Sequence, residues 1–143
     1  MDQPNRASSE HFDVELVAVA RDVETDGDFF DDPETVDAVL FFEVENTADD
    51  PVEWWHDEHC FVDGEGYQYG SGGSVGGAFE DAPGFAPSYW RHHVEVRPGL
   101  TARCVTWVDD LPEGTTLRRV VYDYEGDAYE LAVDETKLDA PPV

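Results

Sequence analysis

The chain of 143 residues carries 34 acidic and 8 basic side chains, which gives a formal net charge of −26. Self-repulsion of this size destabilises a compact fold at low ionic strength, whereas about 1 M salt shortens the Debye length to about 3 Å. The composition therefore indicates an acidic, halophilic (haloarchaeal-type) protein. Nucleic acid and anionic membrane surfaces are excluded as partners, because binding them requires clustered Lys and Arg.

Hydrophobic residues make up 41% of the chain, which is enough for a folded core. No segment reaches the roughly 18–20 apolar residues of a membrane span, and the first ten residues contain no apolar signal core. We therefore expect a cytoplasmic protein, or an exported one only if a signal has been removed. The length fits one domain, which we place at 12–134 between a flexible segment at 1–11 and a tail at 135–143.

Alternating apolar and polar residues recur along the chain with turn residues between the runs, a pattern typical of an all-β fold. One face of the first predicted strand, 12–20, holds Phe12, Val14, Leu16 and Ala18. Further strands are predicted at 36–46, 52–62, 90–96, 103–108, 117–124 and 129–133. About seven or eight strands favour a two-sheet antiparallel sandwich with Greek-key connections, with a closed barrel as the second choice.

Five features of the sequence follow one another along the chain in an order that is typical of a known type of β-sandwich. They are the long strand ending in Asn46, the hairpin at 61–67, the Pro-Gly turn at 98–99, the strand with Val105 and Trp107, and the late strand with Tyr122 and Tyr124. This order resembles the telokin-like, immunoglobulin-type β-sandwich domains of unknown function in prokaryotic proteins. The resemblance implies an immunoglobulin-like sandwich over roughly residues 12–134. It carries over no catalytic residues, because the family shares none.

Two short segments, 54–60 and 89–93, hold four of the five histidines and several aromatic residues. The aromatic side chains can form an exposed platform of the kind that binds proteins or sugars: Trp54, Trp55, Tyr89 and Trp90. The alternative is that they fill the core. Adjacent residues of a strand point to opposite faces, so one residue of each aromatic pair is expected to be buried.

The same two segments supply side chains that zinc prefers: His56, His59, Cys60, His92 and His93. Such a site requires the two segments to pair as neighbouring strands, and the alternative is histidines that are hydrogen-bonded to carboxylates. A calcium site is a further hypothesis for the acidic loop, with the ligands Asp26, Asp28, Asp31 and Asp32. The spacing in this loop is not that of an EF-hand, and a solvated acidic turn is the alternative.

Evidence for catalysis is weak. The segment 72–76 has the G-x-S-x-G pattern, but its Gly/Ser-rich surroundings favour a linker over the strand-to-helix turn that a nucleophile needs. Cys60 and Cys104 are expected to be free thiols that point away from the core, because each is out of phase with its apolar neighbours. We therefore predict a non-enzymatic domain that binds an unknown protein or small ligand. A metal-binding protein is the alternative, and an enzyme is the third choice.

Overall fold

The structure is a computed structural model that describes residues 4–24, 35–55, 58–70, 93–108, 111–112 and 114–138. These residues form an all-β fold, as predicted, with one single-turn 3-10 helix, η2 (Glu135–Lys137). The strands are β1 (Arg6–Ser8), β2 (Phe12–Glu24), β3 (Thr35–Asn46), β4 (Val52–Trp55), β5 (His59–Asp63), β6 (Gln68–Gly70), β7 (His93–Val96), β8 (Thr101–Val108), β9 (Leu117–Tyr124) and β10 (Asp127–Ala132).

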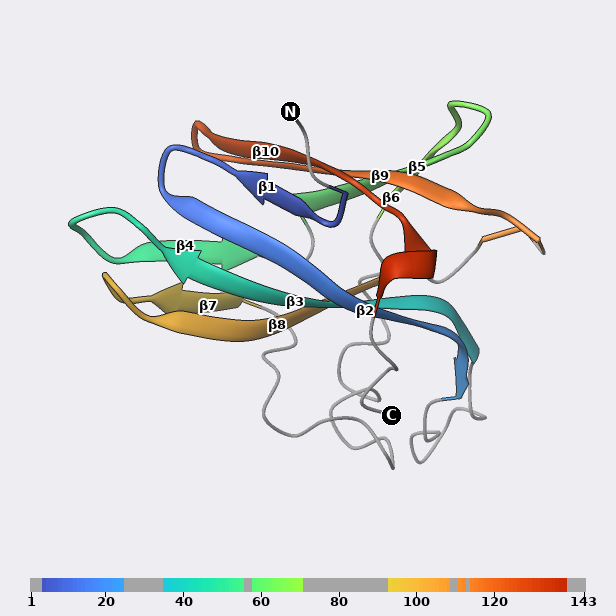
Figure 1. The fold of residues 1–143 in the computed structure, drawn as a ribbon, viewed down its shortest axis with the longest axis horizontal. Helices are drawn as coiled ribbons and strands as arrows, with labels where there is room; N and C mark the ends of the chain where they lie inside the picture. The colour runs from blue at the N-terminus through green and yellow to red at the C-terminus, as the bar shows by residue number, and fades with distance from the viewer. Residues whose placement is uncertain are drawn as a thin grey trace, which may run out of the picture.

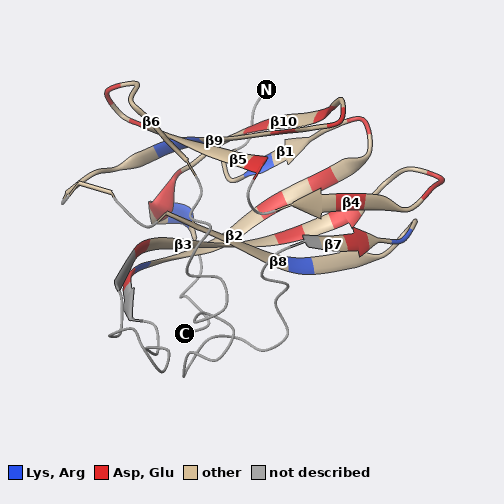
Figure 2. Ribbon diagram, turned by 180° about the vertical axis from the view of Figure 1, so that it is seen from behind, with Lys and Arg blue, Asp and Glu red and all other residues tan. Residues whose placement is uncertain are grey.

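The strands form two four-stranded antiparallel sheets, in the orders β1-β2-β3-β8 and β10-β9-β5-β6, and a two-stranded sheet, β4-β7. The two larger sheets lie over one another as two layers, and the β4-β7 pair lies at one end of them (Figure 1). This arrangement confirms the predicted antiparallel sandwich. Figure 2 shows acidic residues along most of the strands and few basic ones.

The main core lies between the two layers. Strand β3 shows why, because its alternation places Leu40, Phe42 and Val44 on the inner face, where all three are fully buried. The opposite layer contributes Phe61, Leu117, Val120, Tyr122, Tyr129 and Leu131 to the same cluster. Burying large apolar side chains contributes about 1.5–3 kcal/mol each, so this interface is the main source of stability.

The predicted face of β2 is correct for Phe12, Val14 and Leu16 and wrong for Ala18. The register between β2 and β3 shifts between Leu16 and Ala18, which is a β-bulge. A bulge adds one residue and therefore reverses the alternation that follows it. From Ala18 onward the side chains that faced the core face the outside of the sheet, where a second buried apolar cluster forms: Ala18, Ala20, Val39, Phe41, Val105 and Trp107.

The segment predicted as one strand at 52–62 is two strands that belong to different sheets. β4 pairs with β7, whereas β5 lies between β9 and β6. Residues 1–11 were expected to lie outside the domain, yet Arg6–Ser8 forms strand β1 beside β2. The Asn5 amide donates to the Ala132 carbonyl of β10 at 2.6 Å, so the described part of the N-terminal segment joins the two layers.

Buried Asn46 fixes the end of β3. Its side-chain Nδ2 donates to the carbonyls of Asp50 and Val96, each at 2.8 Å, and its Oδ1 accepts from the Ala48 amide at 2.7 Å. One side chain thus ties β3 to the following turn and to β7.

No helix in the described part of the chain is long and apolar enough to cross a bilayer.

Candidate functional site

Two described residues of the aromatic and histidine cluster that the sequence singles out lie in the core. Trp54 is fully buried and His59 is 3% exposed. Their ring centroids are 4.7 Å apart, and the His59 ring is also 4.7 Å from the ring of Tyr122. The prediction that Trp54 belongs to an exposed platform is therefore wrong. β4 turns Trp54 inward because Trp54 faces the same side as Val94 and Val96, the buried residues of its partner strand β7.

A hydrogen-bond network holds this cluster. The Tyr129 hydroxyl lies 2.7 Å from His59 Nε2 and accepts from Trp54 Nε1 at 3.2 Å. Burial raises the pKa of Tyr129 well above its usual value, so the hydroxyl stays neutral. Buried polar groups require such partners. The network therefore gives His59 a structural role in the core, where it is shielded from solvent.

The residues of the metal hypothesis lie partly outside the described ranges. His56 and His92 lie outside the described residues, as does the side chain of His93, although the His93 backbone pairs with Trp55 as the hypothesis requires. Cys60 is half-buried on the face of β5 opposite His59, so these two side chains diverge. Within the described segments, no three His, Cys, Asp or Glu side chains are arranged to hold a metal ion.

Two further groups of predicted residues also lie outside the described ranges. They are the calcium hypothesis, Asp26, Asp28, Asp31 and Asp32, and the aromatic residues Tyr89 and Trp90. The glycine-rich loop beyond Gly70 lies outside them as well. Both thiols are free, as expected. Cys104, however, is fully buried in the main core, contrary to its predicted outward direction, because both faces of β8 are buried in this part of the sheet.

Trp55 of the predicted platform contacts Tyr124, a tyrosine outside the predicted cluster, and we call these two residues the aromatic rim. Both are half-buried, at the ends of β4 and β9, with ring centroids 5.7 Å apart and a tilt of 40° between the rings. The Trp55 backbone amide donates to the Tyr122 hydroxyl at 3.3 Å, which fixes the rim to the buried network. The Trp55 indole Nε1 donates to Glu53 Oε2 at 3.2 Å. The rim is thus an apolar surface of set geometry with a carboxylate at its edge.

Sequence analysis missed a pair formed by a buried acid and a partly exposed histidine. Asp127, at the start of β10, is 4% exposed, and His11 Nδ1 lies 3.4 Å from its Oδ1. Among the described residues neither carboxylate oxygen has a hydrogen-bond partner. Asp127 and Tyr129 share the buried face of β10. Burial raises the pKa of Tyr122 and Tyr129, and the Asp127 carboxylate adds to this rise. His11 and Asp127 are 116 positions apart along the chain, so no local sequence pattern predicts their contact.

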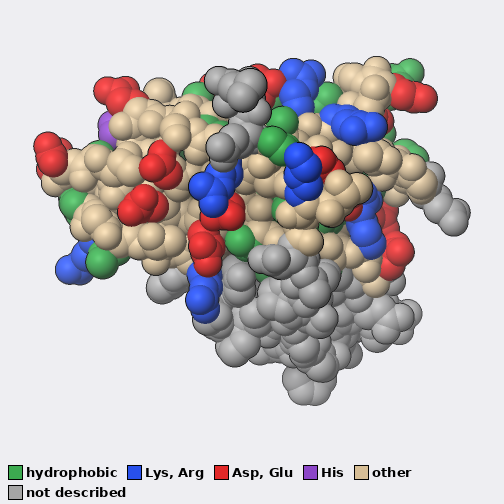
Figure 3. Space-filling view, viewed as in Figure 1, with side chains coloured by type: hydrophobic (Ala, Val, Ile, Leu, Met, Phe, Trp, Pro, Cys, Tyr) green, Lys and Arg blue, Asp and Glu red, His purple; other side chains and the backbone are tan. Residues whose placement is uncertain are grey.

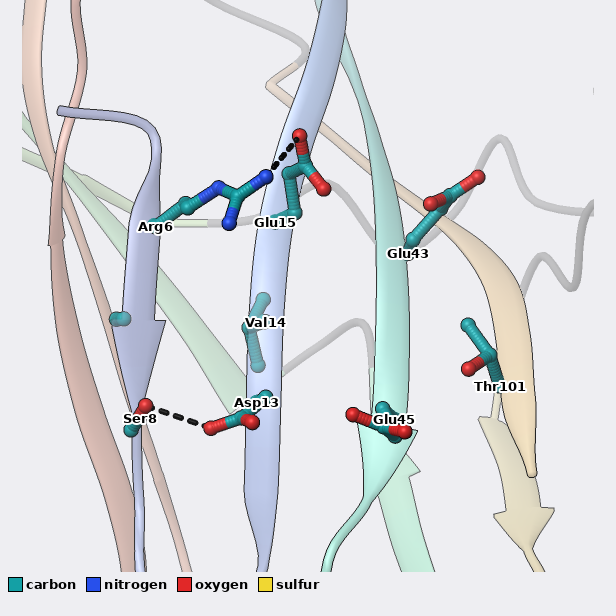
Figure 4. A pocket seen from close by; sticks show the side chains of 9 residues that line it. Arg6, Ser8, Asp13, Val14, Glu15, Glu43, Glu45 and Thr101 are labelled. Carbon is teal, nitrogen blue, oxygen red and sulfur yellow. Dashed lines mark hydrogen bonds and ion pairs between the residues drawn. The ribbon is translucent and has the colours of Figure 1, made fainter. Parts of the chain in front are cut away.

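The outer face of the β1-β2-β3-β8 sheet carries a second polar surface, the acidic face, which consists of Asp13, Glu15, Glu43 and Glu45. Register pairs Asp13 with Glu45 and Glu15 with Glu43 across β2 and β3. Figure 4 shows these side chains level with each other around an open depression of about 350 Å³. Arg6 bonds Glu15 at 3.3 Å, and the Ser8 hydroxyl donates to Asp13 at 2.6 Å.

Carboxylates are common on the exposed surface as well as in this depression (Figure 3). Three further depressions lined by described residues are open to solvent, and two of them share Gly114 and Thr115. In the aromatic rim, two partly exposed aromatic rings contact each other, and hydrogen bonds fix Trp55 in place.

Comparisons with known proteins concern the fold. No protein-family model matches the sequence, and no curated protein matches it significantly. The structure is similar to the crystal structure of the yjhA protein from Bacillus subtilis, with a TM-score of 0.61 and 11% sequence identity. The match covers 94% of this chain and 100% of that one. At this identity the likeness shows a shared β-rich fold and assigns no activity.

Proposed function

We propose that this chain is a salt-adapted, cytoplasmic, non-enzymatic binding domain whose ligand or partner contacts the aromatic rim. The observation that carries the proposal is the half-buried pair of Trp55 and Tyr124, whose rings are 5.7 Å apart at the edge of the sandwich. Aromatic side chains at a surface provide large apolar contact areas and are enriched in binding hot spots. The hydrogen bond from Trp55 to Glu53 and the bond from its amide to Tyr122 hold the rim in place before a ligand arrives.

Two observations support the salt adaptation. The first is the net charge of −26. The second is that acidic residues face each other directly across neighbouring strands in the pairs Asp13–Glu45, Glu15–Glu43 and Glu53–Glu95. Like charges in such positions destabilise a sheet, and concentrated salt screens them. The proposal includes the telokin-like, immunoglobulin-type affiliation, which the antiparallel sandwich and the order of sequence features support.

The test is nuclear magnetic resonance in concentrated KCl with candidate ligands of several classes. The four tryptophan indole N–H groups serve as reporters, because Trp55 lies at the rim whereas Trp54 and Trp107 are fully buried. We expect a bound ligand to shift the Trp55 signal and to leave that of Trp107 unchanged. Ligands that bind while shifting only residues of the acidic face, or that are converted to products in the same sample, contradict the proposal.

A further inference from the structure

The aromatic rim lies among carboxylates that come from three different parts of the chain. Glu53 on β4 accepts the indole N–H of Trp55 at 3.2 Å. Burial raises the pKa of the Tyr124 hydroxyl, and the charges of Glu125, Glu53 and Glu58 raise it further. Glu125 directly follows Tyr124 in the chain, and Glu58 and Glu125 are both exposed to solvent.

A site that combines aromatic rings with carboxylates prefers a positively charged ligand over a neutral or negative one. The face of an aromatic ring is negative and attracts cations, most strongly when the ring is that of Trp. An organic cation also presents apolar groups that pack against the rings, whereas a small inorganic cation holds its water more strongly. At molar salt the Debye length is about 3 Å, so screening removes distant attraction and leaves contacts of this kind.

We infer that the aromatic rim binds an organic cation, an alkylammonium or guanidinium group, against the solvent-facing side of the Trp55 and Tyr124 rings, with Glu53 at the edge of the rings and Glu58 and Glu125 as the neighbouring acids. The inference rests on the proposed binding role and adds the class of ligand. The same chemistry is offered by a free small molecule and by a Lys or Arg side chain of a partner protein. Both sources place the charged group against the rings.

The first experiment compares choline with its uncharged isostere, 3,3-dimethylbutan-1-ol, in about 1 M KCl. The two probes have the same shape and differ in charge. We expect choline to shift the indole N–H signal of Trp55 saturably and to bind about fivefold or more tightly than the isostere, within the range of cation–π energies. A Trp55→Phe variant assigns the signal, because this substitution removes the indole and keeps an aromatic ring.

Variants then separate charge from packing. The double variant Glu58→Gln/Glu125→Gln keeps the rim. For charges about 5 Å apart it should lower the affinity for choline about fivefold in 0.1 M KCl and about 1.7-fold in 1 M KCl, while leaving that for the isostere unchanged. Two matched controls lie elsewhere on the surface: Glu130→Gln, an exposed acid that pairs with Arg119 at 2.7 Å, and Tyr67→Leu, a tyrosine that is 64% exposed. Neither control should change the affinity for choline.

A second titration identifies the source of the cation. It uses a short peptide with one Arg and the same peptide with uncharged citrulline in its place. Saturation by the Arg peptide, with or without choline binding, supports the inference and assigns the cation to a protein partner. Equal affinity for choline and its isostere overturns the cation class and leaves the binding role intact. A Trp55 signal that neither choline nor the Arg peptide shifts overturns the inference, and the screen of other ligand classes then tests the binding role separately.

Discussion

Two cross-strand carboxylate pairs give a direct way to measure what the surface charge does to this fold. Asp13 faces Glu45 across β2 and β3, and Glu53 faces Glu95 across β4 and β7. All four side chains are exposed. Residues directly opposite one another in an antiparallel sheet have Cβ atoms about 5 Å apart. The variant Glu45→Gln/Glu95→Gln removes one charge from each pair and keeps the bonds of Asp13 to Ser8 and of Glu53 to Trp55.

The expected gain follows from Coulomb's law. Two unit charges about 5 Å apart in water repel by about 0.8 kcal/mol. A Debye length of about 10 Å in 0.1 M salt reduces this to about 0.5 kcal/mol per pair, and one of about 3 Å in 1 M salt reduces it to about 0.15 kcal/mol. We therefore expect the double variant to be more stable than the wild type by about 1 kcal/mol in 0.1 M KCl and by about 0.3 kcal/mol in 1 M KCl.

Urea unfolding followed by tryptophan fluorescence measures both differences. Glu130→Gln is the matched control, because Glu130 is also an exposed strand carboxylate but faces Val121 and pairs with Arg119. Its neutralisation should give no gain at either salt concentration. A gain for the double variant that is the same in 0.1 M and 1 M KCl, or that the control reproduces, refutes the assignment of the repulsion to these pairs.

Three further substitutions test single sites by the same unfolding assay. Asn46→Ala removes a buried side chain with three hydrogen bonds, leaves the Val96 carbonyl without its donor and should cost about 2–4 kcal/mol; a loss below about 0.5 kcal/mol contradicts this role. Burial alone would raise the pKa of Asp63, but hydrogen bonds from the Tyr67 and Glu65 amides and from the Tyr69 hydroxyl lower it on balance. The contribution of Asp63 is therefore complete above the unfolded-state pKa of about 3.9 and is lost as the pH falls through the lower native pKa, so Asp63→Asn should flatten the acid limb of the stability profile. His11→Ala leaves the buried Asp127 carboxylate without the imidazole beside it and should cost about 1–3 kcal/mol, of which His11→Ala/Asp127→Asn should recover part; an unchanged stability of the single variant argues against the pair.

Alternation predicted those parts of the fold in which one face of a strand meets the core without interruption. In β3 the period of two placed Leu40, Phe42 and Val44 correctly, because no bulge breaks this run before Asn46. The required pairing of the two aromatic segments also occurs, with Trp55 opposite His93. The placement in β3 follows from local sequence, since side-chain direction in a strand depends on position alone, whereas the pairing of Trp55 with His93 joins distant segments and stood only as a condition of the metal hypothesis.

The failures have physical causes that a local pattern does not carry. The bulge between Leu16 and Ala18 has no residue signature, and it reverses the faces of the rest of β2. Cys104 was assigned outward because alternation says which residues share a face and not which face is covered. His59 shares the phase of buried Phe61, and this signal could have predicted its burial. The pair of His11 and Asp127 arises from packing between distant segments, which the sequence alone does not show.

Both proposals assume a domain whose folded state depends on salt, and this assumption has one direct test. The measurement is the free energy of unfolding of the wild-type chain as a function of KCl concentration. We expect it to rise steadily toward molar KCl, because the net charge and the like-charged cross-strand pairs Asp13–Glu45 and Glu53–Glu95 oppose folding until salt screens them. A free energy of unfolding that stays constant from millimolar to molar KCl contradicts the salt adaptation.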